Sequence, residues 1–249
     1  MPQTDPPAST TPTALAGRTA LVTGASRGIG RSVSLSLAQL GARLLLVARD
    51  RKALAEIQQE IVDLATAAEA FPCDLASSSE IQALASRVDA AGGCDILVNA
   101  AGIGRIGMPL HEMALEDFEA IFATNVRAPF LLMRAVVPHM RALGSGDIVN
   151  ISSLAGQGPL ANGAAYAASK WALNGLSYSV AEELRAHNIR VSVIAPGSVN
   201  TSFGGAGGAG KDRAKMLQPE DVAAAVTMLV TQPRHAFISE LRMRPTQKP

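Results

Sequence analysis

The sequence predicts an α/β fold in which helices cover both faces of a doubly wound parallel sheet. Short runs rich in Val, Ile and Leu alternate along the chain with longer segments whose apolar residues recur at helical spacing. The short runs are apolar at consecutive positions, which is typical of strands buried on both faces of a parallel sheet. A glycine-rich turn also follows the first run. A chain of 249 residues with this pattern is compatible with one domain.

The strands are predicted where the short apolar runs occur. The first run, Thr19–Thr23, leads into the glycine-rich turn, and the second, Arg43–Ala48, contains the sequence Leu-Leu-Leu-Val. The complete set of expected strands is 19–23, 43–48, 68–73, 95–99, 147–152, 190–195 and, at the end of the chain, 240–243.

Helices are predicted between these strands. Residues 53–64 form the clearest amphipathic example, with four apolar side chains on one face. The long segment 115–143 contains Pro129 and Pro138, and we expect an interruption near one of these prolines. The expected helices are 32–40, 53–64, 81–91, 115–143, 164–186 and 222–231.

Residues 1–14 are expected to form a disordered extension before a single domain at 15–249. The beginning of the chain is rich in Pro, Thr and Ser, so it has little apolar surface to offset the entropy of ordering. It also lacks the basic start and apolar centre of a signal peptide. No run approaches the roughly 18 apolar residues that a membrane span needs. We therefore expect a cytoplasmic protein. The glycine-rich stretch 204–210 is expected to be mobile.

Composition argues against several classes of function. The net charge of +1 gives no sign of a nucleic-acid or membrane-surface protein. Four His and two Cys are too scattered for a metal site, so no metal is expected. Charged residues make up only 17% of the chain, against roughly a quarter in an average soluble domain. This shortfall suggests that some surface is buried between subunits.

The glycine-rich turn predicts a phosphate-binding site. Residues 23–30 read Thr-Gly-Ala-Ser-Arg-Gly-Ile-Gly between a predicted strand and a predicted helix. Glycines let the chain turn sharply there and bring its backbone close to a pyrophosphate at the helix N-terminus. The spacing Gly-x-x-x-Gly-x-Gly differs from the commoner Gly-x-Gly-x-x-Gly pattern. The alternative is a glycine-rich turn that binds no ligand.

A second motif predicts acid–base chemistry. Tyr166 and Lys170 stand four residues apart, on the same face of a predicted helix. A nearby ammonium favours a phenolate and lowers the pKa of tyrosine, which suits proton transfer to a carbonyl oxygen. Ser153 follows the predicted strand 147–152, and ligands bind at this edge of open parallel sheets. An ordinary exposed helix is the alternative for the Tyr–Lys pair alone.

Taken together, these motifs resemble the short-chain dehydrogenase/reductase family. The chain is similar to its 3-oxoacyl-(acyl-carrier-protein) reductases and its broad-specificity carbonyl reductases. The resemblance covers about residues 15–243 and implies a Rossmann-like doubly wound sheet. Its matching motifs are Thr-Gly-x-x-x-Gly-x-Gly at 23–30, Asn-Ala-Ala-Gly at 99–102, the tetrad Asn125, Ser153, Tyr166 and Lys170, and Pro-Gly at 196–197.

The resemblance assigns a role to each tetrad residue. Tyr166 would donate the proton to a substrate carbonyl, and Ser153 would hydrogen-bond the carbonyl oxygen. Lys170 would also hold the nicotinamide ribose, and Asn125 would position a water that relays protons to Lys170. The residues expected to bind the cofactor are Gly24, Ser26, Arg27, Gly28, Ile29, Gly30, Arg49, Asp74, Leu75, Asn99, Ala100, Gly102, Tyr166, Lys170, Pro196, Gly197, Val199 and Thr201.

The cofactor is predicted to be NADP(H), with NAD(H) possible. An acidic residue after the second strand favours NAD, whereas arginine accommodates a 2′-phosphate. Here Arg49 precedes Asp50, and Arg27 in the glycine-rich turn supplies a second cation. Asp50 is alternatively the N-cap of the next helix. The same alternative applies to Asp74, which the resemblance places at the adenine.

The predicted function is therefore reduction of a ketone or aldehyde, or oxidation of the matching alcohol. A 3-oxoacyl-(acyl-carrier-protein) reductase is an alternative, although residues 238–245 lack the glycine-rich finish typical of those enzymes. A non-catalytic cofactor-sensing scaffold is another, although all four tetrad candidates are present. The family's assemblies imply a homodimer or homotetramer, packed through the helices that carry Asn125 and Tyr166.

The sequence says little about the substrate. The segment 202–215, which forms much of the lid in this family, is short and rich in glycine. An apolar wall or ordinary core packing is expected of Leu154, Leu160, Phe203 and Met108. Arg105 either meets an anionic substrate or is a solvated surface charge.

Overall fold

The computed structural model describes residues 14–203 and 212–249. Two segments with predicted behaviour lie outside the described residues: the extension expected to be disordered, of which only residue 14 is described, and the stretch 204–210 expected to be mobile. The packed fold begins immediately, because Leu15 is buried and its backbone N–H donates to the carbonyl of Leu40 at 2.9 Å.

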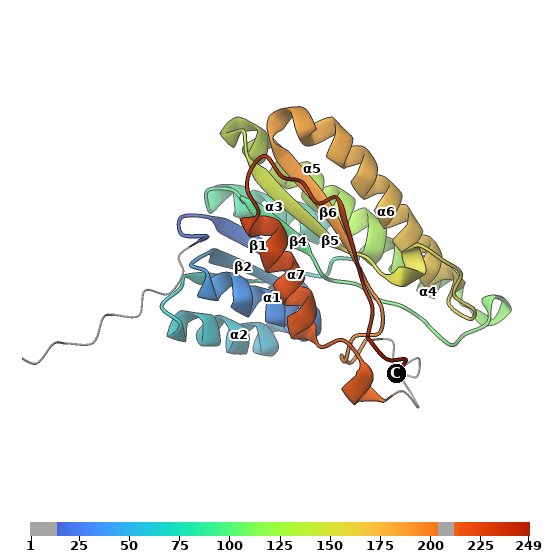
Figure 1. The fold of residues 1–249 in the computed structure, drawn as a ribbon. Coiled ribbons are helices and arrows are strands. Elements are labelled where there is room, and N and C mark those ends of the chain that lie inside the picture. The colour runs from blue at the N-terminus through green and yellow to red at the C-terminus, as the bar shows by residue number, and fades with distance from the viewer. Residues whose placement is uncertain (1–13, 204–211) are drawn as a thin grey trace, which may run out of the picture.

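A seven-stranded parallel sheet forms the centre of the described chain (Figure 1). The order of the strands is β3-β2-β1-β4-β5-β6-β7. The chain starts in the middle of the sheet. Strands β2 and β3 are added on one side of β1, and β4 to β7 on the other. Such a switch in strand order, here between β1 and β4, opens a crevice at the carboxyl ends of the strands. The strands are β1 Thr19–Thr23, β2 Arg43–Ala48, β3 Ala68–Pro72, β4 Ile96–Asn99, β5 Gly146–Ile151, β6 Ile189–Pro196 and β7 Glu240–Met243.

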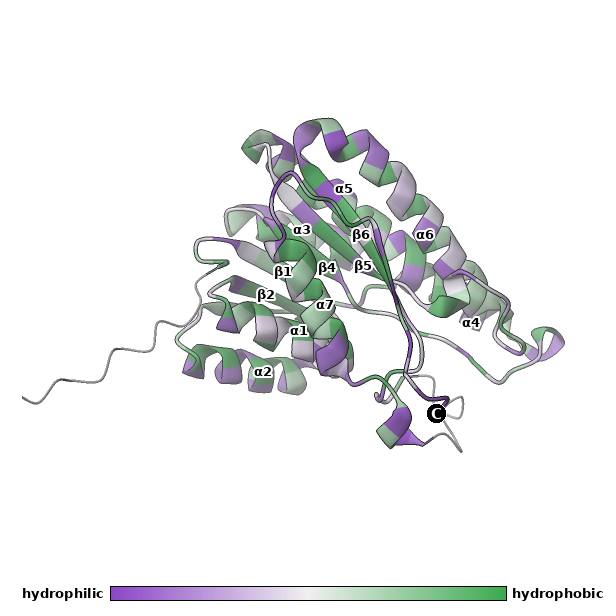
Figure 2. Ribbon diagram, viewed as in Figure 1, coloured by the Kyte–Doolittle hydropathy of each residue, from purple (hydrophilic) through white to green (hydrophobic). Residues whose placement is uncertain are grey.

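Helices cover both faces of the sheet, as predicted. Helices α1, α2 and α7 pack on one face and α3, α5 and α6 on the other, so the strands lie between two apolar cores. Figure 2 shows the strands as apolar and the outer faces of the helices as largely hydrophilic. The helices are α1 Gly28–Gln39, α2 Arg51–Asp63, α3 Ser78–Ala90, α4 Leu115–Phe122, α5 Ala128–Leu143, α6 Ala164–Leu184 and α7 Pro219–Thr231.

The predicted interruption of the long helical segment is present, close to Pro129. A π-helical turn, Ala123–Arg127, separates α4 from α5. Pro129 lies in the first turn of α5, two residues after the π-helical turn. Pro138 lies inside α5 without ending it.

This same segment, Leu115–Leu143, is long and apolar enough to cross a membrane by length and composition alone. In the structure, 44% of its most apolar window is buried inside the protein. Its apolar character therefore matches a helix whose inner face packs on the sheet, as α5 does through Leu132 and Val136.

Candidate functional site

A cleft of about 1810 Å³ lies at the carboxyl ends of the strands. It contains the catalytic candidates Ser153, Tyr166 and Lys170. The cofactor candidates that line it are Gly24, Ser26, Arg27, Gly28, Ile29, Gly30, Arg49, Asp74, Leu75, Ala100, Gly102, Pro196, Gly197, Val199 and Thr201. Two candidates do not line this cleft, Asn99 and Asn125.

The glycine-rich turn is shaped for close approach of a ligand to its backbone. Gly24 and Gly28 have φ angles of +67° and +53°, in the left-handed region that favours glycine. A Cβ on Gly30 would lie 2.2 Å from the carbonyl oxygen of Gly24, so the turn packs directly on the first turn of α1. The N-cap of α1 is Arg27, whose side chain makes no capping hydrogen bond. The first residues of α1, Gly28–Gly30, line the cleft, and a helix N-terminus at this place suits a pyrophosphate.

The catalytic candidates come from β5 and α6. Ser153 follows β5 and accepts a hydrogen bond from the Ala155 N–H at 3.1 Å, which fixes its hydroxyl at the strand end. Tyr166 and Lys170 lie one turn apart on α6 and are 7% and 4% exposed. The Lys170 ammonium donates to the Ile151 carbonyl at 2.8 Å and lies 5.8 Å from the centre of the Tyr166 ring.

Burial controls the pKa values of this pair. Burial of Tyr166 raises the pKa of its phenol, and the neighbouring Ser153 hydroxyl acts in the opposite direction. Burial also lowers the pKa of Lys170 to about 8. The expected lowering of the tyrosine pKa by Lys170 is thus not found, because desolvation of the ring dominates. Tyr166 is protonated at neutral pH, which is the form a proton donor needs.

Asn125 lies in the π-helical turn and supports the cleft from behind. Its side-chain amide donates to the Ile103 carbonyl at 2.8 Å and to the Ser169 hydroxyl at 3.0 Å. Its amide oxygen accepts from the Ile103 N–H at 2.9 Å. These bonds join α6 to the chain after β4. A Cβ on Gly102 would lie 3.4 Å from this amide oxygen and 3.5 Å from the Lys170 nitrogen, so only a glycine separates the two side chains.

Asn99 belongs to the frame of the site. It is buried at the end of β4 and donates to the Asn150 amide oxygen at 2.8 Å. Asn150 in turn donates to the Ser177 hydroxyl at 2.8 Å. These hydrogen bonds connect β4 to β5 and α6, and Ser153, Tyr166 and Lys170 lie after β5 and on α6.

The two arginines predicted to meet a 2′-phosphate both line the cleft. Arg27 and Arg49 are exposed there. Asp50 accepts hydrogen bonds from the N–H groups of Lys52 and Ala53 at 3.0 and 3.1 Å, so its interpretation as the N-cap of α2 is confirmed.

The corresponding interpretation of Asp74 as a helix cap is wrong. Helix α3 begins at Ser78 and Ser77 is its N-cap, whose hydroxyl accepts from the Glu80 N–H at 3.3 Å. Asp74 instead accepts from the Ala76 N–H at 3.0 Å in the turn after β3.

The suggested apolar wall is present with one exception. Leu154, Leu160 and Phe203 line the cleft, and the Phe203 ring lies 5.5 Å from the Tyr166 ring. Met108 does not line it, and its backbone N–H donates to the Asn162 carbonyl at 3.1 Å.

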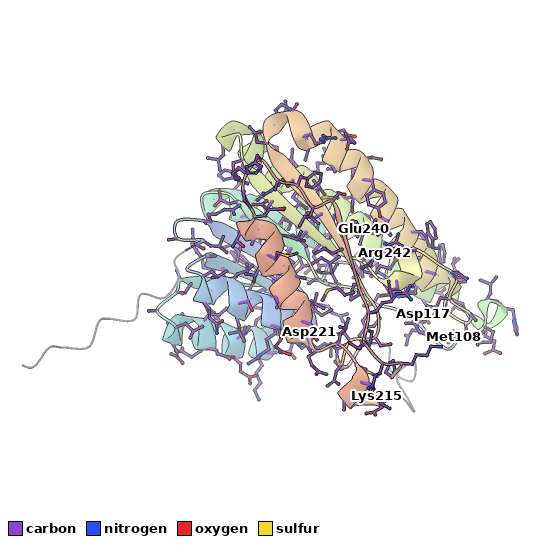
Figure 3. All side chains as sticks on the ribbon, viewed as in Figure 1. Met108, Asp117, Lys215, Asp221, Glu240 and Arg242 are labelled. Carbon is purple, nitrogen blue, oxygen red and sulfur yellow. The ribbon has the colours of Figure 1, made fainter. Side chains whose placement is uncertain are left out.

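Arg105 does not line the cleft either. Its side chain is more than half exposed and pairs with Asp117 at 3.0 Å. Figure 3 labels both Asp117 and Met108 in this region. The interpretation of Arg105 as a surface charge is therefore the one that fits.

The sequence does not predict that the segment after β7 contributes to the cleft. Residues 244–249, which follow β7, line the cleft, as do Arg213 and Met216. The segment after β7 is held in place because the Gly197 N–H donates to the Met243 carbonyl at 2.9 Å. No motif or spacing marks residues 244–249, because only the pairing of β7 with β6 brings them to the site.

Comparisons with known proteins identify the family of this chain. A sequence profile described as short chain dehydrogenase matches residues 18–206. D-threitol dehydrogenase from Mycolicibacterium smegmatis is 35% identical and aligns over 87% of this chain and 87% of its own length.

Two solved structures are similar over nearly the whole chain. A metagenomic short-chain oxidoreductase in complex with NADP is 49% identical, with a TM-score of 0.84, and the match covers 94% of this chain and 100% of that one. An alcohol dehydrogenase from the archaeon Thermococcus sibiricus, complexed with 5-hydroxy-NADP, is 28% identical, with a TM-score of 0.86 and coverage of 93% and 98%.

Proposed function

This chain belongs to the short chain dehydrogenase family, and we propose that it is an NADP(H)-dependent reductase of ketones or aldehydes. As a member of this family it is an oxidoreductase. The observation that carries the proposal is the meeting of Ser153, Tyr166 and Lys170 in one cleft with the glycine-rich turn. The reverse reaction is oxidation of a secondary or primary alcohol by the same groups.

The residues of the cleft supply binding and proton transfer. The nicotinamide cofactor supplies the hydride when it is bound. Ser153 hydrogen-bonds the carbonyl oxygen of the substrate, and Tyr166 donates a proton to the same oxygen as negative charge develops there. Lys170 supports loss of that proton by placing a cation near the ring. The Phe203 ring beside Tyr166 keeps water from this side of the phenol.

The preference for NADP(H) is argued from charge. Arg27 and Arg49 offer two exposed cations at the end of the cleft where β1 and β2 finish. Asp50, the acidic residue that favours NAD elsewhere, is occupied as the cap of α2. The presence of NADP in the metagenomic relative supports the same preference.

We also propose a homodimer or homotetramer. Helices α4, α5 and α6 carry large apolar side chains that are exposed in the single chain, and clustered apolar surface of this kind marks interfaces. These side chains are Leu115, Phe118, Phe130, Trp171 and Tyr178. Sedimentation at micromolar concentration should show a dimer or larger species, and a monomer would contradict this part of the proposal.

The experiment that tests the function follows the absorbance of NADPH, and separately NADH, with a panel of ketones, aldehydes and 3-oxoacyl thioesters. We expect oxidation of NADPH with at least one neutral or charged ketone or aldehyde. Tyr166→Phe should lower kcat by at least about a thousandfold while NADPH still binds. Faster turnover with NADH would contradict the cofactor preference. Binding of NADPH with no turnover of any compound would favour the scaffold alternative.

A further inference from the structure

A second group of cations lines the cleft on segments that follow β6 and β7. Arg213 lies on the short helical turn Arg213–Lys215, and Arg244 and Lys248 lie after β7. All three side chains are exposed, and within the described ranges none of them forms an ion pair. The charged residues near them in the sequence do form ion pairs. Lys215 pairs with Asp212 at 3.4 Å. Arg242 pairs with Glu240 at 2.8 Å.

Backbone hydrogen bonds fix both segments beside the catalytic end of the cleft. The Leu217 N–H donates to the Ser198 carbonyl at 3.0 Å, which ties the turn of Arg213 to the loop after β6. The segment of Arg244 is joined to the same loop at Gly197, where an added Cβ would lie 3.3 Å from Pro245 and 3.2 Å from Leu154. This loop continues to Phe203, whose ring lies against Tyr166. Figure 1 shows the chain ending beside the turn of Arg213, and Figure 3 labels Lys215 there.

Among the described residues, no acidic side chain from the segments after β6 and β7 lines the cleft. The acidic residues that line the cleft in the described part of the chain are Asp50 and Asp74, which follow β2 and β3. Both already accept backbone hydrogen bonds in their own turns. A cleft lined by positive charges attracts anions and raises their local concentration. The cations that follow β6 and β7 lie on other segments of the chain than Arg27 and Arg49, to which we assign the cofactor phosphate.

We propose that the carbonyl substrate carries an anionic group, a carboxylate or a phosphate, which Arg213, Arg244 and Lys248 bind at the mouth of the cleft. Leu154 and Phe203 would contact the apolar part between this group and the carbonyl. The inference rests on the proposed function, because it assumes that the carbonyl sits at Tyr166. It adds the chemical class of the substrate and the residues that select it.

The kinetic test compares matched charged and neutral carbonyl compounds. The probes are 4-oxopentanoate against its methyl ester, and glyceraldehyde 3-phosphate against glyceraldehyde, with NADPH at saturation. The wild type should have a higher kcat/KM for at least one charged partner, and the two pairs distinguish carboxylate from phosphate. Equal or higher kcat/KM for both neutral partners would overturn the inference.

Variants identify the residues responsible. Arg213→Gln, Arg244→Gln and Lys248→Gln should each raise KM for the charged probe about three- to fivefold, and the Arg244–Lys248 double variant about tenfold or more. The kcat value for the charged probe should not change, and neither should the KM value for the neutral probe. Lys215→Gln is the matched control, because Lys215 shares the turn of Arg213 but does not line the cleft. An increase in KM for NADPH instead would assign these cations to the cofactor and overturn the inference.

A binding measurement separates this inference from the proposed function. Tyr166→Phe saturated with NADPH is titrated with 4-oxopentanoate or glyceraldehyde 3-phosphate, and cofactor fluorescence is recorded at low and high salt. We expect binding of a charged probe that weakens with salt and in the Arg244 and Lys248 variants. If the Tyr166→Phe variant binds the charged probe in this way but the wild type turns over no carbonyl compound, the proposed function is rejected and the anion site is retained. Binding that ignores charge, salt and these variants would reject the anion site alone.

Discussion

Individual side chains in the cleft differ in whether the sequence alone could reveal them. Ser153, Tyr166 and Lys170 fall in a spaced motif, and the structure brings them to one cleft. Arg244 and Lys248 fall in no motif, and they reach the cleft only because β7 pairs with β6. Local spacing therefore reveals residues that act on one helix or turn, whereas residues assembled by sheet pairing need the fold.

Arg49 provides a test of the cofactor preference. Arg49→Gln removes one of two cations from the end of the cleft beside β2. The Kd for NADPH should rise about tenfold, since a charge-assisted bond to phosphate contributes roughly 1.5–3 kcal/mol, and the Kd for NADH should change little. Fluorescence titration of both cofactors measures this. Arg51→Gln, on the first turn of α2, is the control. Equal losses for NADPH and NADH would contradict recognition of a 2′-phosphate by Arg49.

Lys170 predicts an unusual dependence of stability on pH. Its ordinary pKa of 10.5 is lowered to about 8 by burial, so between these pH values the unfolded chain binds more protons than the folded chain. Folding stability therefore rises as the pH increases through this window.

Lys170→Met removes this titration. Comparing wild type and variant in urea denaturation without cofactor, we expect the difference in unfolding free energy to shift by about 3 kcal/mol in favour of the wild type from pH 7 to pH 10.5. The shift is independent of the lost hydrogen bond to Ile151, which affects both pH values alike. A difference that stays constant across this range would contradict the buried, titrating ammonium.

At the scale of elements, the strands are easier to predict than the helix starts. β1 and β2 begin and end where the apolar runs do, because a strand buried on both faces is apolar along nearly its whole length. β7 also has the predicted bounds, although it reads Glu-Leu-Arg-Met and is only partly buried. Helix α1 begins at Gly28 rather than near residue 32, and α7 at Pro219 rather than near 222. The first turns of these helices carry glycine, proline and polar caps, so hydrophobic periodicity does not mark them.

The interruption between α4 and α5 lies close to Pro129, as predicted, but no pattern in the sequence predicts its π-helical form. The wider π-helical turn holds Asn125, whose amide is fully used in hydrogen bonds to Ile103 and Ser169. These hydrogen bonds join residues that are 22 and 44 positions apart in the sequence. Prolines 129 and 138 are visible in the sequence, whereas the partners of Asn125 are not.

The contact between the glycine-rich turn and α1 depends on a single missing Cβ. Gly30→Ala would place a methyl group 2.2 Å from the Gly24 carbonyl oxygen, which requires the turn to move. NADPH binding should weaken by at least about tenfold, because the helix N-terminus would no longer face the phosphate. Fluorescence titration measures this, with circular dichroism to confirm folding. Gly158→Ala is the control, since nothing lies within 4 Å of its Cβ position. Unchanged affinity in Gly30→Ala would mean that the turn adapts.

At the scale of the whole molecule, the two edges of the sheet have different tasks. The carboxyl ends of the strands form the cleft, and the amino ends are held together by a buried carboxylate. Asp147 at the start of β5 is 3% exposed and bonds Arg190 at 2.7 Å and Arg18 at 2.6 Å. Arg234, which follows α7, approaches it at 3.4 Å. One acidic side chain thus joins the segments before β1 and after α7 to the centre of the sheet.

Asp147→Asn leaves these three arginines without their shared counter-charge. Unfolding free energy should fall by about 3–5 kcal/mol, the usual cost of removing one partner from a buried ion pair, as measured by urea denaturation at neutral pH. The exposed pair of Glu182 and Arg185 supplies the contrast, and Glu182→Gln should change stability by less than about 1 kcal/mol. Because Asp147 lies at the edge opposite the cleft, the folded fraction of Asp147→Asn should keep the wild-type affinity for NADPH. Weaker binding by fully folded protein would show instead that the two edges are coupled through the strands.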